Sequence, residues 1–348
     1  MPEKILTIID SINNLGIYIH YPFCVRECFY CDFYKRTSFD SRFYEDLLSE
    51  VLIFKQELLN LEYDFKLIDT IYFGGGTPSL MSVKFVEKLL DLIYQNFRVC
   101  KEVEINFEIN PDISVGYLRD LKSLGINRIS IGVQSFNLFG LRIMGRTHSP
   151  EQIFTTIKNV EKFFDNYNID MLCLYPYQDI DSLREDLNIV ISISPPHVSY
   201  YLMDVDKRIL YPNILLKKIY QLYEVSDDFY QVIQECLSVC YDHYEVSNFA
   251  QSQLYCRHNL KYWYYCDYIG FGPSAVSKLT IGNKVLRTIK INQREWEYID
   301  SLTQIREKIF LALRTKWGIV INGTLVKLDD FRNYYTKTLD ILKAYGIE

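Results

Sequence analysis

Three cysteines lie close together near the start of the chain, at Cys24, Cys28 and Cys31. With three residues and then two residues between them, their thiolates can bind three corners of a cuboidal iron–sulfur cluster from a single loop. Such a cluster usually has four cysteine ligands, so one iron would be left open to a small molecule. Zinc is the alternative, but it prefers two pairs of ligands, and His20, which could complete a set, lies on a predicted strand. The spacing therefore predicts an iron–sulfur site.

A run of glycines, Gly74, Gly75 and Gly76, is followed directly by Thr77. Glycines let the backbone approach a ligand closely and leave N–H groups free to bind it. No lysine follows at the spacing of a P-loop, so the run does not indicate a nucleotide-phosphate site. A ligand-binding turn and a plain turn are both compatible with this run.

Polar side chains also accompany the later β-rich runs of the sequence. They supply two carboxylates, one amide and one guanidinium group, which together suit a zwitterionic ligand with ribose hydroxyl groups. Each is a weak signal alone, but several that converge on one site form a stronger one. These residues are Glu108, Gln134, Arg146 and Asp170.

The elements that must position these residues are six β-rich runs that alternate with helical stretches. Alternation of this kind predicts a parallel sheet with right-handed crossovers. Six units are fewer than the eight of a closed barrel, so we predict an α/β fold with a partial (β/α)6 TIM-like barrel, its chemistry at the carboxyl ends of the strands. The runs are Ile17–Phe23, Thr70–Phe73, Glu104–Ile109, Arg128–Val133, Asn168–Leu174 and His197–Met203.

The segments between the runs carry helix signals. Apolar residues recur at helical spacing in Arg42–Leu59 and Met81–Phe97, and Ser182–Ile191 supplies a further helix. Ser149, followed by Pro150 and Gln152, is typical of a helix N-terminus.

The alternation of strands and helices stops at about Asp206, which predicts a second, smaller region. We expect one domain over residues 1–205 and a C-terminal α/β domain over residues 206–348. Helices are predicted in this second domain at Asp227–Tyr241, Arg294–Arg314 and Asp329–Ala344.

Composition narrows the class of protein. The 348 residues carry a net charge of −6 without a run of basic residues, which argues against a nucleic-acid partner. Glu3 and Asp10 interrupt the start of the chain, so it does not read as a signal peptide, and no uncharged apolar stretch of about 18 residues occurs. Nine cysteines without such a signal indicate a reducing compartment. A cytoplasmic location is therefore expected.

Eight segments together resemble the radical S-adenosylmethionine (SAM) superfamily. Within it, they are most similar to the branch that holds oxygen-independent coproporphyrinogen III oxidases and HemW-type haem chaperones. The resemblance runs from about Gly16 to the C-terminus. The segments are YIHYPFCVRECFYCDF, GGGTPS, EINP, GINRISIGVQSF, GRTH, YEVSNFA, CRHNLKYW and DYIGFGPSA.

The resemblance implies a [4Fe–4S] cluster on the three cysteines, whose fourth iron binds the methionyl group of SAM. It also implies that Gly75, Gly76 and Thr77 hold the amino-acid end of SAM, with two tyrosines beside it. Four further positions match family residues that contact SAM, and in the oxidases some of them serve a second SAM molecule. The tyrosines are Tyr18 and Tyr30, and the four positions are Glu108, Gln134, Arg146 and Asp170.

Two features favour the haem-chaperone branch over the oxidases. The oxidases usually carry a further cysteine two residues after the third cluster cysteine, where this chain has Phe33, and they have a longer N-terminal arm. The resemblance therefore implies a radical SAM haem chaperone that binds haem and delivers it to target haemoproteins. The alternative is an enzyme that decarboxylates coproporphyrinogen III oxidatively with SAM, in porphyrin biosynthesis, and another radical reaction is a third hypothesis. Whether the chain is an enzyme stays open.

The segment His258-Asn259-Leu-Lys-Tyr262-Trp263 resembles the HNxxYW signature of the haem chaperones. Imidazole is a good axial ligand for haem iron, so His258 is the candidate haem-binding residue. The alternative is that His258 only forms hydrogen bonds within a packed aromatic loop. Implied partners are SAM, haem or porphyrin, and acceptor haemoproteins, membrane-associated ones included, and a homodimer is compatible with the sequence.

Two glycines of the family pattern after Asp170 are replaced here, by Leu174 and Tyr177. If those positions require a positive φ, the loop has to be rebuilt. The C-terminus also looks short beside its relatives, so we expect an incomplete winged-helix-like tail.

Overall fold

Six runs rich in buried Ile, Val and Phe form adjacent parallel strands. The computed structural model describes residues 12–64, 66–203, 224–251, 253–288 and 295–347. Strands β1 to β6 lie side by side in chain order, which confirms the predicted α/β fold with a partial barrel. Their bounds are β1 Leu15–Tyr21, β2 Ile68–Gly75, β3 Val99–Ile109, β4 Arg128–Gln134, β5 Tyr167–Cys173 and β6 His197–Leu202.

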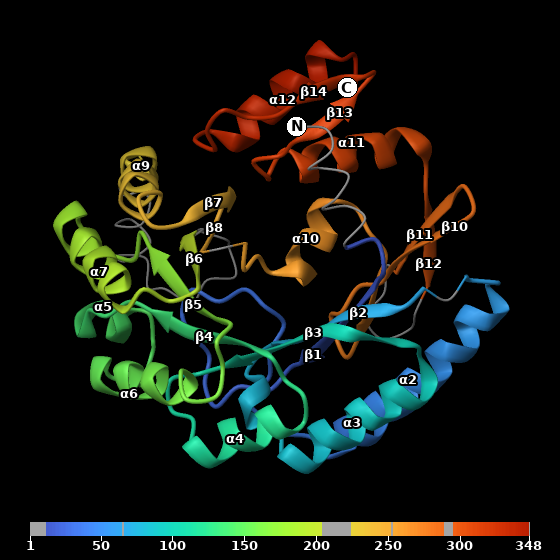
Figure 1. Cartoon of the computed structure of the whole chain (residues 1–348), viewed down its shortest axis with the longest axis horizontal. Helices are drawn as coiled ribbons and strands as arrows, with labels where there is room; N and C mark the ends of the chain where they lie inside the picture. The colour runs from blue at the N-terminus through green and yellow to red at the C-terminus, as the bar shows by residue number, and fades with distance from the viewer. Residues whose placement is uncertain (1–11, 65, 204–223, 252, 289–294, 348) are drawn as a thin grey trace.

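Helices cover the outer, convex side of these strands (Figure 1). Each buries an apolar stripe, such as Phe43, Leu47, Val51, Phe54 and Leu58 in the first of them. The helix predicted after Ser149 begins with a complete capping box between Ser149 and Gln152. The helices are α2 Arg42–Asn60, α3 Val83–Asn96, α4 Val115–Ser123, α5 Leu138–Ile143, α6 Pro150–Val160 and α7 Ile180–Ile193, with a short 3-10 helix, η1, at Pro78–Leu80.

Strands from the second half of the chain extend the same sheet at both edges. β9 pairs in parallel with β1, and β8 pairs antiparallel with β6. Within the described residues, these strands complete a twelve-stranded sheet, beside a separate pair, β13 and β14. The added strands are β7 Asp242–Glu245, β8 Asn248–Ala250, β9 Tyr268–Phe271, β10 Lys278–Ile281, β11 Lys284–Thr288 and β12 Trp296–Ile299.

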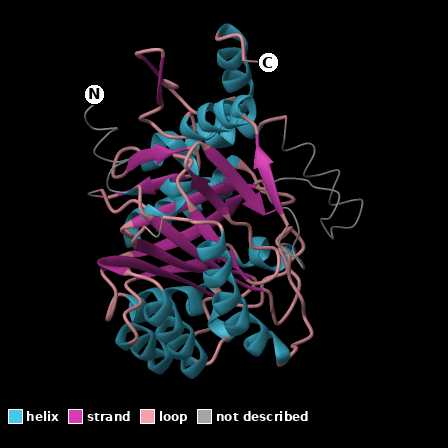
Figure 2. Ribbon diagram, turned by 90° about the vertical axis from the view of Figure 1, so that its right-hand side faces the viewer, coloured by secondary structure: helices cyan, strands magenta, loops and turns pink. Residues whose placement is uncertain are grey.

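The remaining elements are helical apart from the short β13 (Ile319–Ile321) and β14 (Thr324–Val326). Most of them lie on the opposite side of the strands from the helices of the barrel (Figure 2), whereas α9 (Ser226–Leu237) packs beside α7. The division at residue 206 stays a prediction, because residues 204–223 lie outside the described part. The helices are α9 Ser226–Leu237, α10 Arg257–Trp263, α11 Ser301–Ala312 and α12 Tyr334–Ala344.

The helix predicted over Arg294–Arg314 is wrong in its first part. Residue 294 lies outside the described residues, and Trp296–Ile299 forms strand β12 against β11 instead. Asp300 then accepts hydrogen bonds from the backbone N–H groups of Leu302 and Thr303, and α11 begins at Ser301. Pairing with a neighbouring strand, together with this N-cap, outweighs the helical pattern of the segment.

Helix α10 closes the amino-terminal end of the barrel. Its Lys261 forms an ion pair with Asp69 at the start of β2, and its His258 shares a hydrogen bond with Thr70 on the same strand. A side chain at Gly16 in β1 would collide with Lys261, whose Cδ would lie 2.9 Å from its Cβ. The three cysteines follow the opposite, carboxyl end of β1. The two family signatures therefore lie at opposite ends of the barrel.

In the parts of the chain that the structure describes, no helix combines the length and apolar character needed to cross a membrane.

The loop after β5 keeps the backbone that glycine favours, although glycine is absent. Leu174 has φ 65° and Tyr177 has φ 67°, so both positions lie in the left-handed region. The amide of Leu174 donates to the Gln178 side-chain oxygen over 2.7 Å, and the amide of Gln178 donates to the carbonyl of Tyr175 over 3.1 Å. These hydrogen bonds hold the turn in the left-handed conformation. The two side chains at Leu174 and Tyr177 are therefore accommodated with backbone strain.

We expect Tyr177→Gly to stabilise the protein slightly. The left-handed conformation costs a non-glycine residue about 1–2 kcal/mol, whereas added glycine entropy costs about 0.5–1 kcal/mol. Tyr177 is 52% exposed, and the contact that it loses, with the exposed ring of Phe139 at 6.3 Å between centroids, lies at the surface. A net gain of about 0.5 kcal/mol in unfolding free energy should therefore be measured by denaturant titration. The control Tyr94→Gly, in helix α3, should instead lose about 1 kcal/mol. An equal loss of unfolding free energy in Tyr177→Gly and Tyr94→Gly would contradict the proposal that the backbone at Tyr177 is strained.

Candidate functional site

A cavity of about 450 Å³ opens at the carboxyl ends of the parallel strands. Its wall combines the cysteine loop, the glycine turn after β2 and the ends of β3 to β6. This is where parallel-sheet folds of this type place their chemistry. Most of the residues singled out from the sequence meet here, namely Cys24, Cys28, Tyr30, Cys31, Gly75, Gly76, Thr77, Glu108, Gln134, Arg146 and Asp170.

The sulfur atoms of the cysteine loop have polar partners from other loops. The hydroxyl of Thr77 donates to Cys24 Sγ over 3.4 Å, and Arg146 Nη1 donates to Cys28 Sγ over 3.6 Å. Burial raises the pKa of the Cys24 thiol, while the Thr77 hydrogen bond and the charges of Lys35 and Arg146 lower it. Donors of this kind favour thiolates and tune a bound cluster.

The donor set of this loop fits a cluster bound through three irons. All three thiols open onto one cavity, and no other cysteine lines it as far as the structure describes the wall. Within the described residues, no three His, Cys, Asp or Glu side chains are arranged to hold a single metal ion. A cuboidal cluster on this loop would therefore present its fourth iron to the interior of the cavity.

The glycine turn packs directly against the cysteine loop. A Cβ at Gly76 would lie 2.9 Å from the Phe23 carbonyl oxygen and 3.0 Å from Cys24 Sγ, and Gly75 has φ 109°. The amide of Gly76 donates to the Tyr21 carbonyl over 2.7 Å. The amide of Thr77 likewise donates to the Phe23 carbonyl over 2.9 Å. The amides of Gly76 and Thr77 are therefore not free for a ligand, because they fasten the turn to the end of β1 and the start of the cysteine loop. That Gly75, Gly76 and Thr77 hold the amino-acid end of SAM stays a prediction.

Two buried carboxyl groups face the cavity from β3 and β5. Glu108 accepts a hydrogen bond from the Tyr72 hydroxyl over 2.9 Å. Asp170 accepts from Ser130 over 2.8 Å and from Asn168 over 2.9 Å. Burial, and next the charge of Asp170, raises the pKa of Glu108 to about 8, and burial also raises that of Asp170. A cationic ligand group would restore the ionised forms.

We expect Glu108→Gln to remove a pH dependence of stability. The pKa of Glu108 is about 8 in the folded protein and roughly 4.3 in an unfolded chain. The folded state thus retains a proton that the unfolded chain releases. The contribution of Glu108 to stability is fully present below about pH 4, and it falls by roughly 5 kcal/mol as the pH rises through about 8. Denaturant unfolding across this range checks it, and an equal fall in the Gln variant would contradict the assignment.

Arg146 joins the cysteine loop to the barrel. Its Nη2 donates to the Asn110 side chain over 2.7 Å and to the Gly132 carbonyl over 2.9 Å, in addition to the contact with Cys28. Its Nε is buried without a hydrogen-bond partner among the described residues. A buried guanidinium N–H without a partner is costly, so Arg146 bears this cost while it holds the cysteine loop against the barrel.

Two predicted residues lie outside this cavity. The described part of its wall does not include Tyr18 or His258. The Tyr18 hydroxyl shares a 3.2 Å hydrogen bond with His20, beneath the glycine turn. His258 is 1% exposed, and burial lowers its pKa to about 3.

Both ring nitrogens of His258 are already engaged. Nδ1 lies 2.8 Å from the Thr70 hydroxyl and Nε2 lies 2.8 Å from the Tyr262 hydroxyl. Of the two hypotheses for this residue, the geometry favours hydrogen bonding within a packed aromatic loop. Haem ligation by His258 stays a prediction, and it would require the imidazole to give up at least one of these hydrogen bonds.

The sequence reasoning did not single out several residues that line the cavity. Tyr72 comes from β2, Tyr201 and Met203 come from β6 or directly after it, and His148 follows Arg146. The rule that ligands bind at the carboxyl ends of parallel strands could have identified Tyr201 and Met203. The same rule would not have identified Tyr72, because it lies within β2 and reaches the cavity only because its side chain points inward, toward Glu108.

A family model of the radical SAM superfamily matches residues 18–190 of this chain. Curated proteins named "Heme chaperone HemW" are similar over most of its length. That of Buchnera aphidicola subsp. Acyrthosiphon pisum is 33% identical over 86% of this chain and 81% of the relative. That of Lactococcus lactis subsp. lactis is 32% identical over 94% and 86%. That of Escherichia coli K12 is 33% identical over 80% and 74%.

Among solved structures, coproporphyrinogen III oxidase (HemN) from Escherichia coli is similar in fold. Its TM-score is 0.67 at 19% sequence identity, over 99% of this chain and 86% of that chain. The likeness extends beyond the barrel into the C-terminal elements.

Proposed function

The chain belongs to the radical SAM superfamily and, within it, to the HemW family, and from this premise we propose that it is a haem chaperone. It binds haem and delivers it to target haemoproteins, with a [4Fe–4S] cluster and SAM in the cavity of the barrel. The observation that carries the proposal is the convergence of three thiols on that cavity, in a chain whose curated relatives are named haem chaperones.

The residues of the cavity have separate roles in this proposal. Cys24, Cys28 and Cys31 hold the cluster, which when bound supplies one iron without a protein ligand. Thr77 and Arg146 donate hydrogen bonds to the sulfurs. The glycine turn, fastened to the cysteine loop, shapes the wall against which the amino-acid end of SAM lies.

The remaining polar residues orient SAM. Glu108 and Asp170 provide buried negative charge for its cationic groups, and these groups in turn favour the ionised carboxylates. Arg146 contributes positive charge to the wall beside Cys28. Gln134 and Tyr30 complete the wall, and Tyr18 supports it from beneath through His20.

The protein would act in the cytoplasm, and its acceptors would include membrane-associated haemoproteins. A homodimer is compatible with this role. Phe33, at the position where the related oxidases carry a further cysteine, lines the cavity and is 66% exposed. An apolar ring at this place supports the chaperone over the oxidase.

Two incubations of the anaerobically reconstituted protein test the function. With haem, we expect a Soret band and transfer of the haem to an apo-haemoprotein. With coproporphyrinogen III, SAM and a reductant, we expect no protoporphyrinogen at useful turnover. Efficient formation of protoporphyrinogen without haem transfer would contradict the proposal and establish the oxidase instead.

A further inference from the structure

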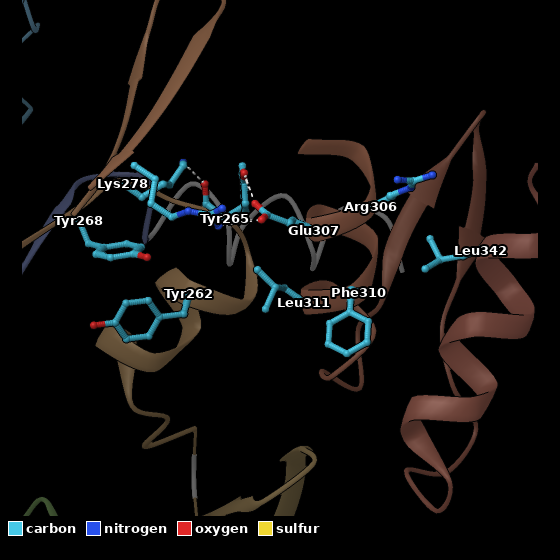
Figure 3. A pocket seen from close by; sticks show the side chains of 10 residues that line it. Tyr262, Tyr265, Tyr268, Lys278, Arg306, Glu307, Phe310, Leu311 and Leu342 are labelled. Atoms are coloured by element: carbon cyan, nitrogen blue, oxygen red, sulfur yellow. Dashed lines mark hydrogen bonds and ion pairs between the residues drawn. The ribbon is translucent and has the colours of Figure 1, made fainter. Parts of the chain in front are cut away.

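A second cavity, of about 410 Å³, lies on the side of α10 that faces α11 (Figure 3). We call it the tyrosine pocket. Its wall is formed by aromatic rings and aliphatic side chains from α10, the turn that follows it, β9, α11 and α12. These are Tyr262, Tyr265, Tyr268, Phe310, Leu311 and Leu342. A wall of this kind suits a flat, largely apolar ligand.

The three tyrosines differ in what their hydroxyl groups contact. Tyr262 shares a 2.8 Å hydrogen bond with His258, and Tyr265 donates to Glu307 over 2.5 Å. The Tyr268 hydroxyl has no hydrogen-bond partner among the described residues, and Figure 3 shows it directed into the space between Tyr265 and Leu311. The Tyr268 ring meets that of Tyr262 edge to face, with centroids 4.7 Å apart. A phenol oxygen is thus held rigidly in the pocket and is free to bind a ligand.

The charges at the pocket favour an anion. Lys278, Arg287 and Arg306 line it, against the single carboxylate of Glu307. Lys278 pairs with Asp267, and Arg287 pairs with Glu297 and Glu307. Arg306 also lines the pocket and has no ion pair with any described residue, so its positive charge is not compensated there. An anionic ligand group would satisfy it.

Haem combines the three properties that this pocket matches: a flat apolar ring, carboxylate groups and a metal with axial positions. We propose that the tyrosine pocket is the haem-binding site, with Tyr268 as axial ligand to ferric iron and Arg306 as partner of a propionate. This inference rests on the proposed function. A tyrosine oxygen is a known type of axial haem ligand. The Fe–O bond forms as the phenol proton passes to the hydroxide bound to the ferric iron, which leaves as water.

The environment of Tyr268 suits this role. Burial raises the pKa of its phenol to about 12, and the charge of Arg287 acts in the opposite direction. A free phenol would therefore stay protonated at neutral pH, and it ionises only when a metal replaces its proton. Haem iron is thus recognised specifically over a ring without a metal.

His258 becomes a positioning residue in this arrangement. Its hydrogen bond to Tyr262 fixes the ring that supports Tyr268. On its other side, the His258 ring lies 5.2 Å from that of Tyr72, whose hydroxyl binds Glu108 in the first cavity. The HNxxYW segment would therefore affect haem binding by shaping the back wall of the pocket. It also provides a packed path between the two cavities.

Titration of the full-length protein with ferric haem tests the site. The wild type should show a tyrosinate-to-iron charge-transfer band, with phenolate modes in its resonance Raman spectrum. Tyr268→Phe should lose both and bind haem at least tenfold more weakly, and should remain folded because the lost hydroxyl has no partner. The exposed control Tyr298→Phe, on β12, should behave as the wild type. Retention of the phenolate modes in Tyr268→Phe, or their loss in Tyr265→Phe alone, would overturn the assignment.

Iron-free protoporphyrin IX separates the two contacts. It should bind Tyr268→Phe as well as the wild type, because it carries no iron, but should bind Arg306→Gln about tenfold more weakly. Unchanged affinity of Arg306→Gln for both haem and protoporphyrin would contradict the propionate contact. If the double variant Tyr268→Phe with Arg306→Gln still binds and transfers haem, the tyrosine pocket is not the haem site, and the proposed chaperone function still stands. Failure of the wild type to bind haem would overturn both.

Discussion

Replacing Cys24, Cys28 or Cys31 by alanine is expected to abolish the iron–sulfur cluster in each case. Three protein thiolates are the minimum set on this loop, and removal of one leaves an iron without a protein ligand in a cavity open to water. After anaerobic reconstitution, the bound iron should fall from about four per chain to near zero. The EPR signal of the reduced cluster should disappear in parallel.

The matched controls for these variants are cysteines away from the loop. Cys240 is exposed and Cys236 partly so, and Cys240→Ala and Cys236→Ala should keep the full iron content and EPR signal. Addition of SAM should change the EPR signal of the wild type, because SAM binds the open iron. A cluster signal that persists in Cys24→Ala, or is lost equally in Cys240→Ala, would refute the assignment of the three ligands.

Lys261→Met is expected to destabilise the protein by about 3–5 kcal/mol. Lys261 Nζ lies 2.5 Å from Asp69, and both side chains are fully buried. Lys261 also donates to the carbonyl oxygens of Ile12 and Asn14, over 2.6 and 2.9 Å. Its removal takes three hydrogen-bond donors from this site and leaves the buried Asp69 carboxylate with only the longer, 3.5 Å contact to Arg257 among the ion pairs of the described residues. The unfolding free energy in urea should show the loss.

A double substitution separates the cost of an unpaired charge from the loss of packing. Burial raises the pKa of Asp69 and lowers that of Lys261. Removing the two charges from water therefore opposes folding, even though they attract each other. Asp69→Leu combined with Lys261→Met should therefore recover much of the stability that Lys261→Met loses. A double variant that is less stable than either single variant would contradict this account. The exposed control Lys284→Met should change stability by less than about 0.5 kcal/mol.

The cysteine loop and the order of the six strands were predictable from the sequence because their signals are local. A ligand set within eight residues depends only on spacing, and alternating apolar runs indicate strands wherever they lie. Helix α6 was equally predictable, because Ser149, Pro150 and Gln152 form its N-terminus by contacts within one turn. Strand β12 was not, because its pairing with β11 is invisible to helical periodicity.

The glycine turn shows where local reasoning fails. Glycine next to a candidate site indicates close backbone approach, and this is correct, but the sequence does not say what approaches. The neighbours are the end of β1 and the start of the cysteine loop, and the amides of Gly76 and Thr77 donate to their carbonyls. The loop after β5 shows the converse case. Leu174 and Tyr177 adopt a left-handed backbone although neither residue is glycine. Hydrogen bonds in the folded loop impose that conformation.

The sequence by itself determined the three thiols, the partial barrel and the family, because each depends on spacing or periodicity along the chain. Only the tertiary structure decided where His258 lies. Helix α10 folds back beneath the barrel, where Asp69 and Thr70 hold it, far along the chain from either residue. That packing engages both imidazole nitrogens and leaves the Tyr268 hydroxyl without a partner in a separate pocket. Contacts between distant segments set which polar atoms remain available, and no local pattern encodes them.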